Sequence, residues 1–312
     1  MPFGQLVIGP PGSGKSTYCY GMYQFMSAIG RKCSVVNLDP ANDHTSYPCA
    51  LDVRDLITIE EVMEDDRLGP NGAVLYALEE LEHNMEWLEE GLNKLGVVLH
   101  LIDSYSLTLP SLYISTLLLS LRAMLQMDLP HLNVLTKIDK LAQYAPLPFN
   151  LDFYTEVQDL SYLLPHLVAE SPVLQSSKFE GLNKAIVELV EEFGLVGFET
   201  LAVEDKQSMM ALLQVIDRAG GYAFGSAEGA NDTVWQVAMR QGGSATMDIK
   251  DVQERWIDAR EEYDEKERKD WEEEAKAREG PQDLAGNPAA DSDDELDGQI
   301  PPDSGIKVIR KT

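Results

Sequence analysis

Cysteine is scarce in this sequence of 312 residues, and basic residues are few. Its three cysteines, Cys19, Cys33 and Cys49, leave one unpaired and form no C-x-x-C motif. A disulfide framework and a zinc site are therefore not expected, and the compartment should be reducing. The 25 basic residues face 53 acidic ones, for a net charge of −28. This charge argues against nucleic acid or an anionic membrane as a direct partner and favours a basic protein.

Signals of several other protein classes are missing as well. The N-terminus shows no basic segment followed by an apolar run, so no secretory signal is expected. The most apolar long stretch, residues 107–125, contains Pro110 and Arg122 and is better interpreted as a buried amphipathic helix than as a membrane span. The five histidines lack metal-ligand spacing, and no Ser-His-Asp or Cys-His set supports covalent catalysis. The expected location is the cytoplasm, with shuttling to the nucleus.

A complete phosphate-loop pattern lies close to the start of the chain. Residues 9–17 read Gly-Pro-Pro-Gly-Ser-Gly-Lys-Ser-Thr, with a strand candidate at 3–8 before them and helical spacing at 17–29 after them. The glycines let backbone N–H groups turn onto an anion, and Lys15 supplies a charge for the terminal phosphates. Ser16 is then placed to hold Mg²⁺. A chance glycine-rich turn is the alternative interpretation.

Two predicted strands end in polar residues that suit a nucleotide site. The strand at 32–38 ends at Asp39, which should face the ligand crevice and is a candidate for Mg²⁺ or its water shell. The strand at 132–135 runs into Thr136, Lys137 and Asp139. In such a turn the carboxylate can accept both N–H groups of a guanine edge, while the lysine stem packs on the ring. A capping turn is the alternative at both places.

A Gly-Pro-Asn turn at 69–71 separates two predicted helices. A short helix is predicted within 52–63, and an amphipathic helix over 73–95. On physical grounds alone, Gly-Pro-Asn is a common turn sequence in loops, and its role would be structural. The apolar stripe of the longer helix could pack on the sheet or against a second subunit, and the sequence leaves both open.

Strands and helices alternate along residues 1–224. Further strands are predicted at 97–102 and 196–203, and further helices at 112–127, 152–164, 182–193 and 208–220. The pattern predicts an α/β fold with a doubly wound, mostly parallel sheet and helices on both faces.

The remainder of the chain has a different composition. Residues 225–247 predict a linker, residues 248–280 a charged helix, and residues 281–312 a disordered acidic tail. A narrow apolar seam on the charged helix could dock a partner. Its members are Val252, Trp256, Tyr263 and Trp271.

The order of these motifs resembles that of the GPN-loop GTPases. The phosphate loop, Asn-Leu-Asp-Pro-Ala-Asn at 37–42, Gly-Pro-Asn at 69–71, His-Leu-Ile-Asp-Ser at 100–104, Thr-Lys-Ile-Asp at 136–139 and the segment 150–157 carry the resemblance. It implies a P-loop NTPase fold that binds GTP or GDP with Mg²⁺ and hydrolyses GTP by in-line attack of water. It also implies a homodimer, or a heterodimer with other GPN-loop GTPases, that acts with RNA polymerase II assembly factors or subunits in assembly and nuclear import of that enzyme.

The resemblance also implies residue roles. The phosphates would be held by Gly12, Ser13, Gly14, Lys15, Ser16 and Thr17. Ser16 and Asp39 would hold Mg²⁺, and Thr136, Lys137 and Asp139 would hold guanine. Gly69, Pro70 and Asn71 would reach across a dimer interface to the other subunit's nucleotide, which makes that turn functional. The expected catalytic residues are Lys15, Asp39 and Asn71.

One segment of the family pattern is missing. Family members have a strand ending in Asp-x-Pro-Gly-Gln, and then a helix, before the His-Leu-Ile-Asp strand, whereas here Gly96 joins directly to Val97. The missing unit, roughly forty residues by its usual size, would place a strand between the Asp39 strand and the phosphate-loop strand. Its carboxylate would sense Mg²⁺ and its Gln would help to place the water. We therefore expect a sheet without one central strand, and binding is a firmer expectation than hydrolysis. A skipped exon or a gene-model error is the simplest explanation.

Two other functions fit the motifs. The first is a catalytically silent nucleotide-binding assembly adaptor. The second is an ATP-dependent kinase of small molecules or RNA ends, because Gly-Lys-Ser and Asp-Pro-Ala also occur there. Single-turnover phosphate release and competition of ATP against GTP separate the three.

Overall fold

The structure, a computed structural model, describes residues 4–42, 45–91, 95–144, 146–170, 177–221 and 248–278. The chain divides into a compact unit that extends to Tyr263 and a second unit that begins at Asp264. The predicted linker (225–247) and acidic tail (281–312) lie outside the described residues. Within the described part, no helix is long and apolar enough to cross a membrane.

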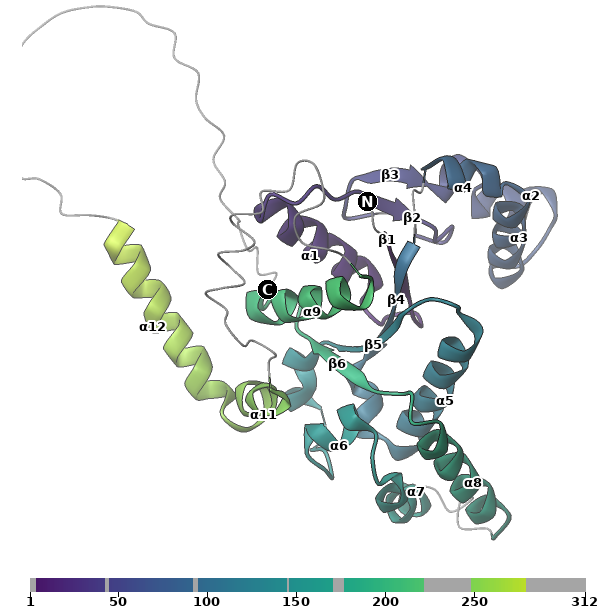
Figure 1. The fold of residues 1–312 in the computed structure, drawn as a ribbon. Coiled ribbons are helices and arrows are strands. Elements are labelled where there is room, and N and C mark those ends of the chain that lie inside the picture. The colour runs from purple at the N-terminus through teal and green to yellow at the C-terminus, as the bar shows by residue number, and fades with distance from the viewer. Residues whose placement is uncertain are drawn as a thin grey trace, which may run out of the picture. The chain divides into compact units, whose positions relative to one another are not determined.

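A parallel sheet of four strands forms the centre of the first unit (Figure 1). Its order is β1 (Gly4–Ile8), β4 (Leu95–Asp103), β5 (His131–Thr136) and β6 (Phe198–Leu201). The register pairs Ile8 with His100 and Asp103 with Thr136. The carboxyl ends of neighbouring strands therefore meet at one edge, where an α/β sheet binds its ligands. The predicted fold class is confirmed.

Two further strands form a separate parallel pair, β2 (Val35–Asn37) and β3 (Cys49–Asp52). Among the described residues, no strand joins β1 to β2. All five residues of β1 are only half-buried, whereas Val97, Val98 and Leu99 of neighbouring β4 are 0% exposed. A phosphate-loop strand at the edge of its sheet is what the loss of a central neighbour produces, as the sequence predicted.

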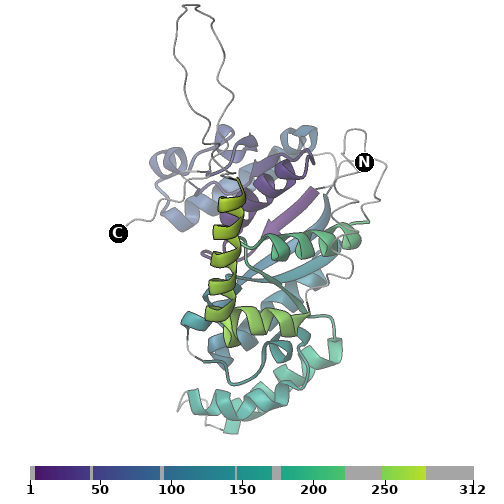
Figure 2. The same cartoon turned by 90° about the vertical axis from the view of Figure 1, so that its left-hand side faces the viewer.

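Helices cover both faces of the four-stranded sheet (Figures 1 and 2). On one face, α1 (Lys15–Ala28) and α9 (Lys206–Ala219) share a core with Leu99 and Leu101. The other face is covered by α5 (Pro110–Gln126), α6 (Leu151–Glu156), α7 (Leu163–Glu170) and α8 (Ser177–Phe193). Ile102 belongs to this second core, as the alternation of side chains along a strand requires.

Some predicted helices are broken. The helix predicted over 73–95 is α3 (Pro70–His83) followed by α4 (Met85–Gly91). The break falls at Asn84, whose side-chain amide donates to the Glu80 carbonyl oxygen at 2.8 Å. The helix predicted over 152–164 is interrupted by Val157 and Asp159, which have left-handed φ values of 55° and 54°. A short helix, α2 (Ile59–Asp65), begins at a Thr58 capping box, and the short strand β3 was not predicted.

The charged segment at 248–280 also differs from the single solvated helix that was predicted. It comprises α11 (Ile249–Gln253), a π-helical turn η6 (Glu254–Asp258) and α12 (Arg260–Arg278). Val252 and Trp256 are 2% and 9% exposed within the second core. Helix α11 contacts α6, and η6 contacts the turn η3 (Ile138–Gln143). These two seam residues therefore pack on their own domain rather than remaining available to a partner.

Candidate functional site

The phosphate loop leaves β1 and turns into α1. Gly9, Gly12 and Gly14 have φ values of 150°, 80° and 88°, a region that only glycine enters freely. A Cβ atom at Gly9 would lie 2.2 Å from the Leu101 carbonyl oxygen of β4. A side chain is therefore excluded where the loop passes the neighbouring strand.

The start of α1 is open to an anion. Gly14 is its N-cap, no side chain caps it, and its first turn contains no acidic residue. Free N–H groups and the helix dipole at such a terminus favour phosphate. The Lys15 ammonium donates to the Gly9 and Pro10 carbonyl oxygens at 3.0 and 3.2 Å, so it lies over the loop. Ser16 and Thr17 are exposed.

The predicted guanine turn is hydrogen-bonded to the phosphate loop. The Thr136 hydroxyl donates to the Ser13 carbonyl oxygen at 2.8 Å, and the Lys137 ammonium donates to the Gly12 carbonyl oxygen at 2.6 Å. Lys137 has a left-handed φ of 58°. Among the described residues, no hydrogen bond engages the half-buried Asp139 carboxylate, which can therefore accept from a base. The structure thus brings together two of the predicted groups.

Two residues at the end of β4 belong to this site, although the sequence analysis gave them no role. Asp103 forms an ion pair with Lys137 at 2.6 Å, and the Ser104 hydroxyl donates to the Lys137 carbonyl oxygen at 3.0 Å. The signal for Asp103 was its place at a strand end next to Thr136, but it depended on knowing the strand order.

The residues expected to hold Mg²⁺ lie near Tyr47. Burial raises the pKa of the Tyr47 phenol to about 12, the Asp39 charge adds to the rise, and an interaction with the Ser16 side chain opposes it. One Asp39 oxygen accepts from the Ala41 amide at 3.0 Å. In the described ranges no cluster of three or more His, Cys, Asp or Glu residues could hold a metal. The hydroxyl oxygen of Ser16 and the carboxylate oxygens of Asp39 are of the type that Mg²⁺ prefers, and these two residues would hold the ion.

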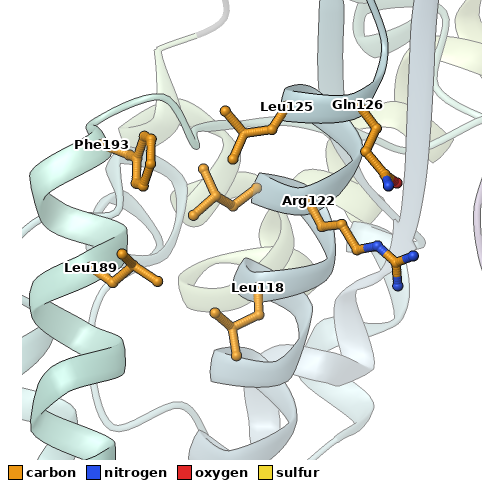
Figure 3. A pocket seen from close by; sticks show the side chains of 7 residues that line it. Leu118, Arg122, Leu125, Gln126, Leu189 and Phe193 are labelled. Carbon is orange, nitrogen blue, oxygen red and sulfur yellow. The ribbon is translucent and has the colours of Figure 1, made fainter.

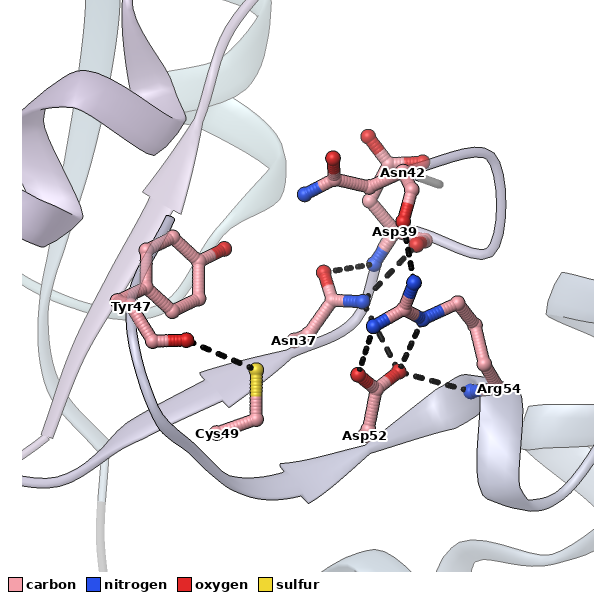
Figure 4. A network of polar contacts seen from close by, with 7 residues as sticks. All are labelled: Asn37, Asp39, Asn42, Tyr47, Cys49, Asp52 and Arg54. Carbon is pink, nitrogen blue, oxygen red and sulfur yellow. Dashed lines mark hydrogen bonds and ion pairs between the residues drawn. The ribbon is translucent and has the colours of Figure 1, made fainter. Parts of the chain in front are cut away.

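A polar network behind Asp39 joins β2 to β3 (Figure 4). The Asn37 amide donates to the Asp39 carbonyl oxygen at 3.2 Å and to Asp52 at 3.0 Å. Arg54 binds the Asp52 carboxylate through two nitrogens, at 2.6 and 2.9 Å. Hydrogen bonds from Arg54 hold the pKa of Asp52 well below its usual range. The network fixes the turn that presents Asp39.

The Gly-Pro-Asn turn forms the start of α3. Gly69 is the N-cap, Pro70 is the first helical residue, and both are exposed together with Asn71. Within the described part of the chain, no hydrogen bond joins this turn to the phosphate loop. The structure therefore does not bring these three predicted residues into the site of the same chain, and their role across a dimer interface stays a prediction.

A groove between α5 and α8 has a different character (Figure 3). It has a volume of about 400 Å³. Its lining is Leu118, Leu121, Arg122, Leu125, Gln126, Leu189 and Phe193. None of the predicted site residues lies in it, and its mainly apolar walls offer little to a phosphate.

Comparison with known proteins assigns the chain to a family. A family model described as a conserved hypothetical ATP binding protein matches residues 7–98 and 93–222. GPN-loop GTPase 2 of Schizosaccharomyces pombe is 48% identical over 313 aligned positions, which cover 89% of this chain and 97% of the relative. This chain belongs to the GPN-loop GTPase family. GPN-loop GTPase 2 of Saccharomyces cerevisiae is 47% identical and covers 86% of this chain and 88% of its own, so the predicted relationship is confirmed.

A solved structure of a GTPase from Pyrococcus abyssi in apo form has a similar fold. It superposes with a TM-score of 0.52 at 19% identity, over 70% of this chain and 98% of that chain. At this identity the likeness concerns the fold alone.

The alignments also locate where this GPN-loop GTPase is shorter than its relatives. The family model matches in two pieces that overlap at residues 93–98. The alignment with the S. pombe relative has 313 positions, more than the 312 residues of this chain, although only 89% of the chain takes part. The relative therefore has residues without a counterpart here. Both observations agree with a loss at Gly96 and Val97 and with the separation of β1 from β2.

Proposed function

We propose that this GPN-loop protein binds GTP and GDP with Mg²⁺ and hydrolyses GTP. The observation that carries the proposal is a pair of hydrogen bonds, which Thr136 and Lys137 donate to the carbonyl oxygens of Ser13 and Gly12 respectively. These contacts support the proposal, because the guanine turn and the phosphate loop could then bind one nucleotide together. The names of the relatives, which are GTPases, support the same conclusion.

Each predicted site residue would have its own role in binding or hydrolysing the nucleotide. Lys15 and the N–H groups at the start of α1 would bind the terminal phosphates, and Asp139 would accept two hydrogen bonds from guanine. Ser16 and Asp39 would hold Mg²⁺, which when bound supplies positive charge beside the phosphates. Water would attack the γ-phosphorus in line with the bond to the departing GDP oxygen, while Lys15 stabilises the charge on the transferred group. Asn71 of a second subunit would add a donor.

A silent nucleotide-binding adaptor is the second candidate, and the open edge of β1 favours it. None of the described residues supplies the carboxylate and Gln of the missing segment. Single-turnover measurement of phosphate release decides between the two candidates. Release above the buffer blank supports the GTPase, whereas tight GTP binding without release establishes the adaptor.

An ATP-dependent kinase is the third candidate, because the matching family model is described as ATP binding. Competition of ATP against labelled GTP tests it on the purified chain. Asp139 predicts a strong preference for GTP, and equal binding of ATP would refute the guanine contacts.

The cellular role is proposed on the resemblance. The protein would pair with itself or with another GPN-loop GTPase and act with assembly factors or subunits of RNA polymerase II, in the cytoplasm and through nuclear import, without binding nucleic acid or membrane directly. Mass measurement in solution tests the pairing. Co-precipitation with polymerase subunits and fluorescence imaging test the partner and the location.

A further inference from the structure

The Lys137 ammonium contacts two groups that come from different elements. It donates to the Gly12 carbonyl oxygen of the phosphate loop and to Asp103 Oδ2 at the end of β4, both at 2.6 Å. Its backbone is left-handed, with φ at 58°, and its carbonyl oxygen accepts from Ser104. The lysine is therefore oriented by neighbours on both sides.

We infer that Asp103 is a positioning residue for guanine recognition, one that keeps the Lys137 stem in place beside the base. The inference rests on the proposed function, because it concerns the same nucleotide. A lysine side chain has several rotatable bonds, and ordering it costs free energy at the moment of binding. A carboxylate that orders it beforehand removes part of that cost.

The two oxygens of Asp103 have separate tasks. Oδ1 accepts from the Tyr105 backbone amide at 3.0 Å and caps the 3-10 turn η2 (Ser104–Thr108), whereas Oδ2 pairs with Lys137. An asparagine keeps an oxygen for the cap and loses the negative charge. Asp103→Asn therefore separates the proposed task from the structural one.

Asp103 lies in the same surroundings as the base-reading carboxylate. Burial raises the pKa of Tyr144, and the charges of Asp103 and Asp139 raise it further while Lys137 lowers it. The Tyr105 and Tyr144 rings meet edge to face, with centroids 5.3 Å apart. The charged groups of Asp103, Lys137 and Asp139 thus all lie close enough to Tyr144 to act on its phenol.

Competition binding of GTP, GDP and ATP to the full chain tests the inference. The side chains of Lys137 and Asp103 are each 30% exposed, so we expect Asp103→Asn to weaken GTP and GDP binding roughly 3- to 5-fold, the range for a partly screened ion pair. The ratio of GTP to ATP affinity should fall, and the unfolding midpoint should stay. The matched control is Asp128→Asn, at an exposed position outside the site, which should change none of these.

A double-mutant cycle shows whether Asp103 acts through Lys137. In a Lys137→Met background, Asp103→Asn should cause no further loss, because the ammonium that it orients is gone. An equal further loss there, or unchanged GTP affinity in the single variant, would overturn the inference. If Asp103→Asn unfolds the chain, Asp103→Glu, which keeps the charge, must retain the preference for GTP or the inference fails. A wild-type chain that does not prefer GTP refutes the proposed function instead.

Discussion

Single backbone positions decide whether the phosphate loop can form. At Gly9 an added Cβ would lie 2.2 Å from the Leu101 carbonyl oxygen and 2.8 Å from the Ser13 hydroxyl oxygen. Ser13 belongs to the phosphate loop, and the Leu101 carbonyl is part of a buried strand. The position can therefore not adapt by moving a flexible side chain.

We expect Gly9→Ala to lower the free energy of unfolding by about 1–3 kcal/mol, the usual range for an overpacked position, and to abolish GTP binding. Gly181→Ala is the matched control, because Gly181 lies on an exposed part of α8 with nothing within 4 Å of its added Cβ. It should raise stability by roughly 0.5–1 kcal/mol through helix propensity. Chemical denaturation measures both, and a neutral Gly9→Ala would contradict the close approach.

The buried His100 and the half-buried His131 predict how stability depends on pH. Burial lowers the pKa of His100 in β4 and of His131 in β5 from the model-compound value of 6.5. The unfolded chain therefore binds more protons than the folded chain as the pH falls below about 6.5, and the free energy of unfolding should fall in that window. A variant with both histidines changed to Gln should lose part of this dependence, whereas exposed His83→Gln should keep it. Denaturant titrations between neutral and mildly acidic pH measure the difference, and parallel curves would refute it.

The sequence predicted the residues whose roles follow from the loop or strand end on which they lie. Lys15, Thr136 and Lys137 are of this kind, and the structure places them around the phosphate loop. Asp103 and Tyr47 were missed because their roles depend on which strand end or turn lies next to them in space. No local pattern distinguishes such a residue from an ordinary cap or a core tyrosine.

The C-terminal elements support the guanine turn. The π-helical turn η6 contacts η3, and Trp256 shares a buried cluster with Ile138, the residue between Lys137 and Asp139. The Leu151 amide also donates to the side chain of Gln253 in α11, at 2.9 Å. A segment remote in sequence therefore helps to fix the turn that should read the base.

Trp256→Ala should lower the free energy of unfolding by about 3 kcal/mol, as for other large buried aromatic residues. It should also weaken GTP binding, because η3 loses its support. Tyr162→Ala is the control, since that ring is 64% exposed, and it should change stability by less than about 0.5 kcal/mol. Stability loss without any change in GTP affinity would show that the turn holds its shape alone.

Element types were predicted better than element boundaries. The strands β4 and β5 and the helices α1, α5 and α9 are long and periodic, so their patterns were readable. The strand β3 has four residues and no such pattern, and its pairing with β2 depends on contacts across the chain. The breaks at Asn84 and Val157 were missed because the helical spacing of apolar residues continues on both sides of each break. The periodicity alone therefore does not show where the backbone leaves the helix.

At the scale of the whole molecule, no ladder of strand hydrogen bonds joins the two described sheets. The half-buried Arg31, just beyond α1, forms an ion pair with the buried Asp217 of α9, at 2.8 Å, but no described strand bridges β1 and β2. An unpaired strand edge leaves backbone groups without partners and invites association.

Inserting the corresponding segment of the S. pombe relative between Gly96 and Val97 should therefore raise the unfolding midpoint by roughly 2–8 °C, which is the effect of about 1–2 kcal/mol in a domain of this size. Single-turnover GTP hydrolysis should rise with it. A Gly-Ser insert of equal length controls for length alone and should do neither. If the native segment also does neither, the separation of β1 from β2 has another cause.

A GTPase that acts as a switch must bind GTP and must also detect when the γ-phosphate has been lost. In this chain the guanine turn would recognise the base and the phosphate loop would bind the phosphates, but no described strand lies between β1 and β2. If single-turnover assays detect no phosphate release, such a molecule would bind GTP and GDP without converting one into the other. As such an adaptor, it would compete with other GPN-loop GTPases for their partners without turning over GTP.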